Sequence, residues 1–197
     1  NNGAALVTAP QTGEILAMIG SRDYFDIAND GNFNVTIADR QPGSSIKPVM
    51  YSLALENGFT PASILEDSPI TFNVAGQPPY TPRNYDNRFH GRIPLRIALA
   101  SSYNVPAVKT LAIIGVNQML ERGKNMGITT WTDPNRYGLS LTLGGGEVKM
   151  TDMAVAYATI ANLGTRVDLH PILKIQTHDG RILEEYSCNP TPCHYYQ

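Results

Sequence analysis

A serine and a lysine three residues apart, Ser44 and Lys47, are the first residues whose types and spacing could support chemistry. Residues i and i+3 share one face of a helix, so the Lys47 amine can reach the Ser44 hydroxyl. A serine hydroxyl is a poor nucleophile at neutral pH, and a lysine can act as its base where burial lowers the lysine pKa. A helix that begins at the serine would also favour an oxyanion beside its positive end. The spacing is nevertheless common by chance, since it arises in roughly every second or third chain of this length.

A second polar group, Ser102-Tyr103-Asn104, interrupts two short apolar segments. Burial of such a trio is unfavourable unless its groups form hydrogen bonds. The Ser102 hydroxyl could relay a proton, the Asn104 amide could hold a peptide carbonyl or the lysine, and Tyr103 could line a cleft. The alternative is an ordinary helix cap, in which serine or asparagine satisfies free N–H groups. Ser187-Cys188-Asn189 has the same spacing, so the pattern alone does not decide between them.

The elements that must position these residues can be predicted from periodicity. Ile46, Val49, Met50 and Leu53 fall on one face of a helix that begins close to Ser44 and ends at Gly58. Pro48 lacks an N–H and therefore belongs in the opening turn of that helix.

Further helices are expected over four segments: Leu95–Ala100, Val105–Ile114, Val116–Met126 and Asp152–Leu163. Thr151 is the expected N-cap of the last of these helices. Two hairpins are expected, one from Ala4–Ala9 with Glu14–Ile19 and one from Ile172–Thr177 with Arg181–Tyr186. Residues 21–41 and 59–92 have the composition of loops. Strands at both ends with helices between them predict an α+β fold whose sheet draws on distant segments.

Composition excludes several classes of function. The chain has 197 residues, of which 42% are hydrophobic and 16% charged, and its formal net charge is −2. This charge balance provides no cationic face for nucleic acid, so no nucleic-acid partner is expected. No apolar run approaches the roughly 20 residues needed to span a bilayer. No metal or other cofactor is expected, because the histidines are scattered and Cys188, Cys193 and His194 lack a fourth zinc ligand. The sequence leaves open whether the two cysteines form a disulfide.

Five segments in one order carry a resemblance to a known family. The segment from Arg40 to Pro48 resembles the nucleophile segment of the penicillin-binding proteins, in particular the bifunctional class A enzymes. The segment from Ala98 to Val108 is similar to their second motif. The resemblance continues through Thr12–Ala17, Leu143–Val148 and Ala156–Gly164, and covers about residues 3–186.

The resemblance implies part of a β-lactamase/transpeptidase-like fold and a serine D-Ala-D-Ala transpeptidase that acts on peptidoglycan stem peptides. Ser44 would form an acyl-enzyme with the penultimate D-Ala, and Lys47 would be its essential partner. Ser102 would pass a proton to the leaving amine, Asn104 would orient the substrate and the lysine, and Tyr103 would contact the substrate. β-Lactam antibiotics would acylate Ser44 in the same way.

The family's third motif, Lys-Thr-Gly or Lys-Ser-Gly, is not found at any lysine of the sequence. We therefore expect residues 1–197 to be one incomplete transpeptidase domain that lacks C-terminal strands. An unpaired sheet edge and weak turnover are the expected consequences. The resemblance also implies an upstream glycosyltransferase domain and a membrane anchor that holds the domain at the extracytoplasmic face of a bacterial membrane. Three alternatives remain: a class B relative, a DD-carboxypeptidase, and an inactive β-lactam-binding sensor or scaffold domain.

Overall fold

The computed structural model describes residues 2–73 and 78–186, which form two compact units. The helical unit comprises residues 41–73, 78–123 and 131–147, and the sheet unit comprises residues 2–40, 124–130 and 148–186. Each described helix is too short or too polar to cross a lipid bilayer. Cys188, Cys193 and His194 lie outside the described residues.

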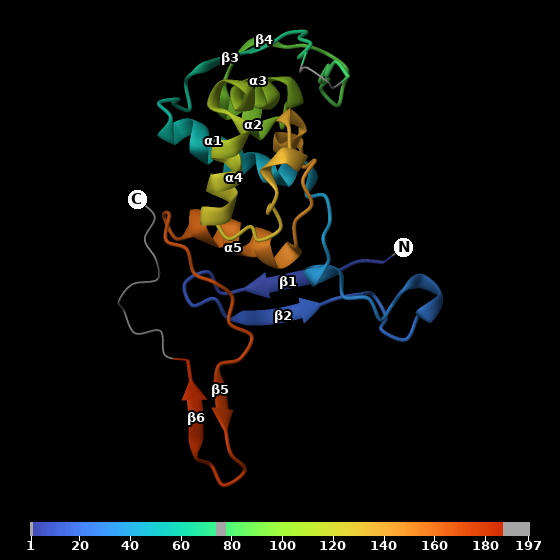
Figure 1. Ribbon diagram of the computed structural model, residues 1–197, viewed down its shortest axis with the longest axis vertical. Helices are drawn as coiled ribbons and strands as arrows, with labels where there is room; N and C mark the ends of the chain where they lie inside the picture. Colours follow the sequence, from blue (N-terminus) through green and yellow to red (C-terminus); the bar gives the residue numbers. More distant parts are fainter. Residues whose placement is uncertain (1, 74–77, 187–197) are drawn as a thin grey trace. The chain divides into compact units, whose positions relative to one another are not determined.

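The helical unit is built around three helices that contact one another: α1 (Lys47–Glu56), α2 (Leu95–Ala100) and α3 (Asn104–Ile114). Figure 1 shows them gathered beneath the β3–β4 strands. The predicted apolar face of α1 is confirmed, because Ile46, Val49 and Met50 are fully buried and Leu53 is 6% exposed. Burial of each such side chain contributes about 1.5–3 kcal/mol. A fourth helix, α4 (Val116–Asn125), begins in this unit.

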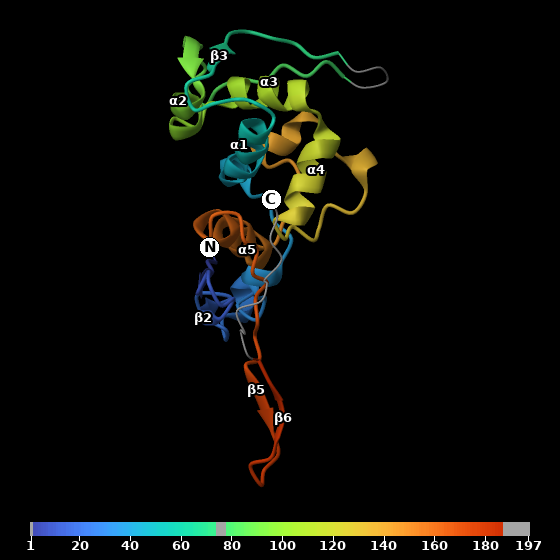
Figure 2. The same ribbon diagram turned by 90° about the vertical axis from the view of Figure 1, so that its left-hand side faces the viewer.

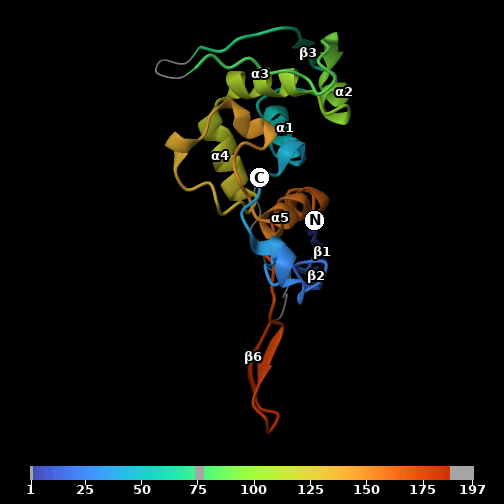
Figure 3. The same cartoon turned by 90° about the vertical axis from the view of Figure 1, so that its right-hand side faces the viewer.

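Two short strands in the helical unit were missed by the sequence pattern. β3 (Ile64–Asp67) and β4 (Gly91–Pro94) pair antiparallel, with Asp67 opposite Gly91. β3 lies within the proline-rich segment 59–92 that composition predicted as loop, and β4 begins at its end. Four residues are too few to establish an alternating pattern. β3 contacts α3, as can be followed in Figure 3. The unit also holds the 3₁₀ turns η3 (Gly43–Ile46), η4 (Pro134–Arg136) and η5 (Leu139–Leu143).

In the sheet unit, the first predicted hairpin is confirmed. β1 (Ala5–Thr8) and β2 (Ile15–Ile19) pair antiparallel, and Gly13 has the positive φ of 76° that their tight turn needs. The helix α5 (Met150–Ala161) packs against β1 and against η2 (Val35–Ile37). A further 3₁₀ turn, η1 (Ile27–Asn29), lies between β2 and η2.

Two details of the sheet unit correct the sequence prediction. Lys149, not Thr151, occupies the N-cap of α5, and no side chain caps this helix from that position. The second expected hairpin does form, from β5 (Lys174–Gln176) and β6 (Ile182–Glu185), and is drawn in red in Figure 2. Among the described residues, however, the strands form three separate two-stranded sheets rather than one sheet from distant segments. Each terminal hairpin is closed by its own turn, and an isolated bridge joins Glu14, just before β2, to His170, in the segment that precedes β5.

Candidate active site

Ser44 lies in the 3₁₀ turn that leads into α1, and Lys47 is the first residue of that helix. The Lys47 backbone N–H donates to the Ser44 carbonyl. Residues i and i+3 eclipse one another in a 3₁₀ turn, so the two side chains share one face. The helix thus begins as predicted near Ser44, but its opening turn is tighter than an α-helix. Ser44 is exposed and Lys47 is buried.

Two glycines allow this turn to pack closely within the helical unit. Gly43 has a positive φ of 58°, and Gly144, at the end of η5, has a φ of 85°. A Cβ on Gly144 would lie 2.3 Å from the Gly43 nitrogen and 2.5 Å from its Cα. Any side chain at residue 144 would therefore displace the backbone that carries Ser44.

The Lys47 side chain is 1% exposed and is surrounded by three neutral oxygens. Its Nζ donates to the Ser102 carbonyl at 2.5 Å, to the Ser102 hydroxyl at 3.1 Å and to Asn104 Oδ1 at 2.7 Å. Burial lowers the pKa of Lys47 to about 8, since removal from water disfavours the charged form. About a tenth of the molecules would then carry a neutral amine at pH 7. This amine is therefore suited to accept a proton from a nearby hydroxyl.

The Ser102-Tyr103-Asn104 group joins α2 to α3 and supplies these oxygens. Ser102 has a left-handed backbone with a φ of 55°, a strained conformation for a residue other than glycine. This conformation accompanies the contact of both its carbonyl and its hydroxyl with Lys47. The helix-cap interpretation is not supported, because Tyr103 occupies the N-cap of α3 without a side-chain hydrogen bond to the helix.

Asn84 is a residue of this site that the sequence pattern missed. Its Oδ1 accepts hydrogen bonds from the N–H groups of Asn104 at 2.8 Å and Val105 at 3.2 Å. The preceding Arg83 carbonyl accepts from Asn104 Nδ2 at 2.9 Å. Asn84 lies in the segment 59–92, whose composition predicts loops, and a buried asparagine in a proline-rich loop gives no periodic signal.

Tyr103 is half-buried, and its ring stacks on His90 with centroids 4.0 Å apart and planes 17° from parallel. The structure therefore brings Lys47, Ser102 and Asn104 into direct contact and holds Tyr103 beside them. A substrate contact of Tyr103 remains a prediction.

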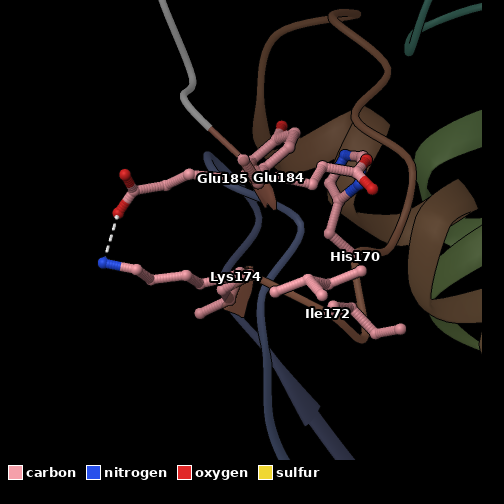
Figure 4. A pocket seen from close by; sticks show the side chains of 8 residues that line it. His170, Ile172, Lys174, Glu184 and Glu185 are labelled. Atoms are coloured by element: carbon pink, nitrogen blue, oxygen red, sulfur yellow. Dashed lines mark ion pairs between the residues drawn. The ribbon is translucent and has the colours of Figure 1, made fainter. Parts of the chain in front are cut away.

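A separate concavity of about 390 Å³ lies in the sheet unit, between β5, β6 and the segment before β5. Figure 4 shows His170, Ile172, Lys174, Glu184 and Glu185 around it. Lys174 forms an ion pair with Glu185 at 3.5 Å. The described residues that line this concavity include no serine or cysteine, so it offers no nucleophile comparable to Ser44.

Comparison with known proteins places this geometry in a family. Residues 3–192 match the family model described as the penicillin-binding protein transpeptidase domain. Penicillin-binding protein 1A of Rickettsia felis is 36% identical over 195 residues, which cover 95% of this chain and 24% of that protein. The protein of the same name from Neisseria meningitidis serogroup A is 37% identical over 185 residues, covering 91% of this chain and 22% of that protein. The chain thus spans about a quarter of the length of these relatives.

Solved structures agree with this relationship. The crystal structure of penicillin-binding protein 1A from Haemophilus influenzae has a TM-score of 0.82 and 32% identity, and the match covers 94% of this chain and 27% of that one. The structure of PonA1 from Mycobacterium tuberculosis in complex with penicillin V has a TM-score of 0.79 and 23% identity. The match covers 92% of this chain and 49% of that one. The α+β, transpeptidase-like fold predicted from the sequence is therefore confirmed. The chain belongs to the penicillin-binding protein transpeptidase family, and the relatives described above that it resembles include penicillin-binding proteins 1A.

Proposed function

We propose that this chain is a peptidoglycan DD-transpeptidase domain in which Ser44 is the acylated nucleophile. The observation that carries the proposal is the buried Lys47 amine, held by Ser102 and Asn104 within one 3₁₀ turn of an exposed serine. The family match over residues 3–192 supports the assignment of the whole chain to one transpeptidase domain.

The reaction follows from the roles that this geometry allows. Ser44 Oγ attacks the carbonyl carbon of the penultimate D-Ala of a stem peptide, and neutral Lys47 accepts the hydroxyl proton. The C–N bond then breaks, and Ser102 passes a proton to the amine of the departing D-Ala. An amine of a neighbouring stem peptide then attacks the ester carbonyl and gives up a proton to Lys47. The C–O bond breaks, Lys47 returns the proton to Ser44 Oγ, and the new amide bond completes the cross-link. A β-lactam would be opened by the same attack and would remain as an ester on Ser44.

The site contacts also suggest how the ester-forming step is supported. Asn104 Oδ1 accepts a hydrogen bond from Lys47 Nζ, and thereby fixes the direction of the amine. Metal chemistry is not required for any of these steps. We further propose that the intact protein carries a glycosyltransferase domain and a membrane anchor, as the 1A name of the relatives suggests, and acts at the extracytoplasmic face of the membrane.

Intact-mass spectrometry after incubation with benzylpenicillin tests the proposal. We expect an adduct of the mass of benzylpenicillin on the wild-type chain, and none on Ser44→Ala. Ser45→Ala is the matched control, because Ser45 is the adjacent serine and its hydroxyl donates to the Pro42 carbonyl. An adduct that persists in Ser44→Ala, or that is absent from the folded wild-type chain, would contradict the assignment. Cross-linking of a paired stem-peptide substrate then distinguishes a transpeptidase from a β-lactam sensor.

A further inference from the structure

A buried amide, Asn84, is held by an unusually complete set of hydrogen bonds. It is 4% exposed. Its Nδ2 donates to both carboxylate oxygens of Asp67, at 2.9 and 2.8 Å, and to the Arg88 carbonyl at 2.8 Å. Its Oδ1 accepts from the first two N–H groups of α3. The side chain therefore connects the end of β3 with the start of α3.

Asp67 is fully buried at the end of β3 and has a defined set of donors. Besides the Asn84 amide, the His90 backbone N–H lies 2.9 Å and His90 Nδ1 lies 2.7 Å from Asp67 Oδ2. The other ring nitrogen of His90 faces Asp86 Oδ2 at 3.2 Å. A buried carboxylate is stable only when it is paired in this way. Asp67 therefore needs these hydrogen-bond donors to remain buried.

The carboxylate determines the orientation of the Asn84 amide. Since both Asp67 oxygens accept from the NH₂ group, the Oδ1 atom must point the other way, toward α3. The first N–H groups of a helix have no partner within the helix, and no side chain at the N-cap of α3 supplies one. Asn84 therefore caps α3 from a loop 20 residues upstream.

The same loop determines the orientation of Asn104. The Arg83 carbonyl accepts from Asn104 Nδ2, which turns Asn104 Oδ1 toward Lys47 Nζ, 2.7 Å away. An unbroken series of hydrogen bonds thus runs from Asp67 through Asn84 to the first residue of α3. The side chain of that residue contacts the lysine.

We propose that Asp67 and Asn84 are positioning residues for the acylation of Ser44, because together they set the orientation of Asn104 and of the Lys47 amine. The inference rests on the proposed function of Ser44 and Lys47. If the pair were purely structural, its loss would loosen the loop without changing the reactivity of Lys47. If the pair positions Lys47, its loss also changes the acylation rate and the pH dependence of that rate.

The test is the second-order rate constant for acylation by benzylpenicillin between pH 6 and 9, measured per folded molecule in the whole chain. In Asn84→Ala and in Asp67→Asn we expect the plateau at high pH to fall about 10- to 100-fold, since small misplacement of a reacting group has effects of this size. The midpoint of the acid limb should move to lower pH. When Asn104 is no longer held in place, its Oδ1 atom ceases to accept from Lys47 Nζ. The ammonium form of Lys47 loses this partner, and its pKa falls.

Two further variants complete the design. The exchange Asp67→Asn with Asn84→Asp keeps one amide and one carboxylate in swapped places. The carboxylate introduced at position 84 can still accept from α3, while the amide introduced at position 67 donates to it. We expect this double variant to recover part of the plateau rate that Asp67→Asn loses. Its acid limb should lie at higher pH than in Asp67→Asn, because the carboxylate at position 84 is closer to Lys47 and favours the ammonium form. Glu66→Gln is the control, because it removes an exposed carboxylate from the same strand and should retain the wild-type profile.

The outcomes separate the two hypotheses. If the folded wild-type chain and Glu66→Gln give no Ser44 adduct, the proposed function itself fails. If both react, and the folded single variants keep the wild-type plateau and midpoint within twofold, the positioning role is refuted. Should Asn84→Ala not fold, Asn84→Ser replaces it, since its hydroxyl is too short to join Asp67 to α3. A folded Asn84→Ser or double variant is then judged by the same plateau and midpoint.

Discussion

The lowered pKa of Lys47 makes a quantitative prediction about the pH dependence of acylation. With a pKa of about 8, the neutral amine makes up about 1% of molecules at pH 6, about a tenth at pH 7 and about half at pH 8. A lysine at its ordinary value of 10.5 would be neutral in only about 0.03% of molecules at pH 7. Burial thus raises the reactive fraction about 300-fold at pH 7.

If neutral Lys47 accepts the proton of Ser44, the acylation rate should follow that fraction. We expect the second-order rate constant with benzylpenicillin to rise about tenfold from pH 6 to 7 and to level off above pH 8. The decline on the acid side reflects protonation of the amine, so the reactive form is lost as the pH falls through about 8. Quenched-flow mixing with benzylpenicillin, with the adduct measured by intact-mass spectrometry at each time point, gives the profile.

Lys47→Arg is the informative comparison, because a guanidinium keeps the positive charge but does not lose its proton in this range. Its acylation should fall at least about 100-fold, without the step near pH 8. A wild-type rate that is constant from pH 6 to 8, or that continues to rise tenfold per unit up to pH 10, would refute the reasoning. The first result would exclude the neutral lysine as the base, and the second would show that its pKa is not lowered.

Further predictions concern the packing around the site and the stability of each unit. Gly144→Ala should lower the unfolding free energy by about 2–4 kcal/mol in urea titrations, and should slow acylation, because its Cβ would overlap the Gly43 backbone. Tyr51→Phe should raise the unfolding free energy by about 1 kcal/mol, since the buried Tyr51 hydroxyl has no hydrogen-bond partner among the described residues. Asp152→Ala should lower it by about 2 kcal/mol in urea, because this buried carboxylate accepts from the Thr129 N–H and hydroxyl, each at 2.8 Å. Between pH 8 and 10.5 only the unfolded chain binds the Lys47 proton, so the unfolding free energy of the wild type should rise with pH in this range. Lys47→Met should abolish this rise, and thermal unfolding at pH 7.5 and 9.5 measures the difference.

The parts of this structure that the sequence predicts are those with a local pattern. The apolar face of α1 repeats every three to four residues, and α2 and the β1–β2 hairpin are bounded by turn residues, so their positions follow from short windows. The prediction of Thr151 as the N-cap of α5 was wrong, although it also rested on a local pattern. A threonine before a helix is a common signal, but α5 has already begun at Met150, so Thr151 lies within its first turn.

The parts that the sequence does not predict depend on contacts between distant segments. β3 and β4 pair across 23 intervening residues, and neither strand is long enough to show alternation. Asn84 lies 20 residues before Asn104 and 17 after Asp67, so no short motif contains all three. The Ser44–Lys47 pair could be proposed from spacing and resemblance, whereas the burial that lowers the Lys47 pKa depends on packing that only the structure shows.

The choice of groups around Lys47 is consistent with its proposed task. A carboxylate in contact with the amine would stabilise the ammonium form and raise its pKa, which would oppose the effect of burial. The partners of Nζ are instead a carbonyl, a hydroxyl and an amide oxygen, all neutral. The buried charge that anchors this arrangement belongs to Asp67, and the Asn84 side chain separates it from α3. An amide between carboxylate and helix therefore transmits orientation to Asn104 without placing a negative charge beside the lysine. On this argument, Asn84→Asp alone should be more harmful than its small change in shape suggests, because it sets two carboxylates against each other and brings a charge closer to Lys47.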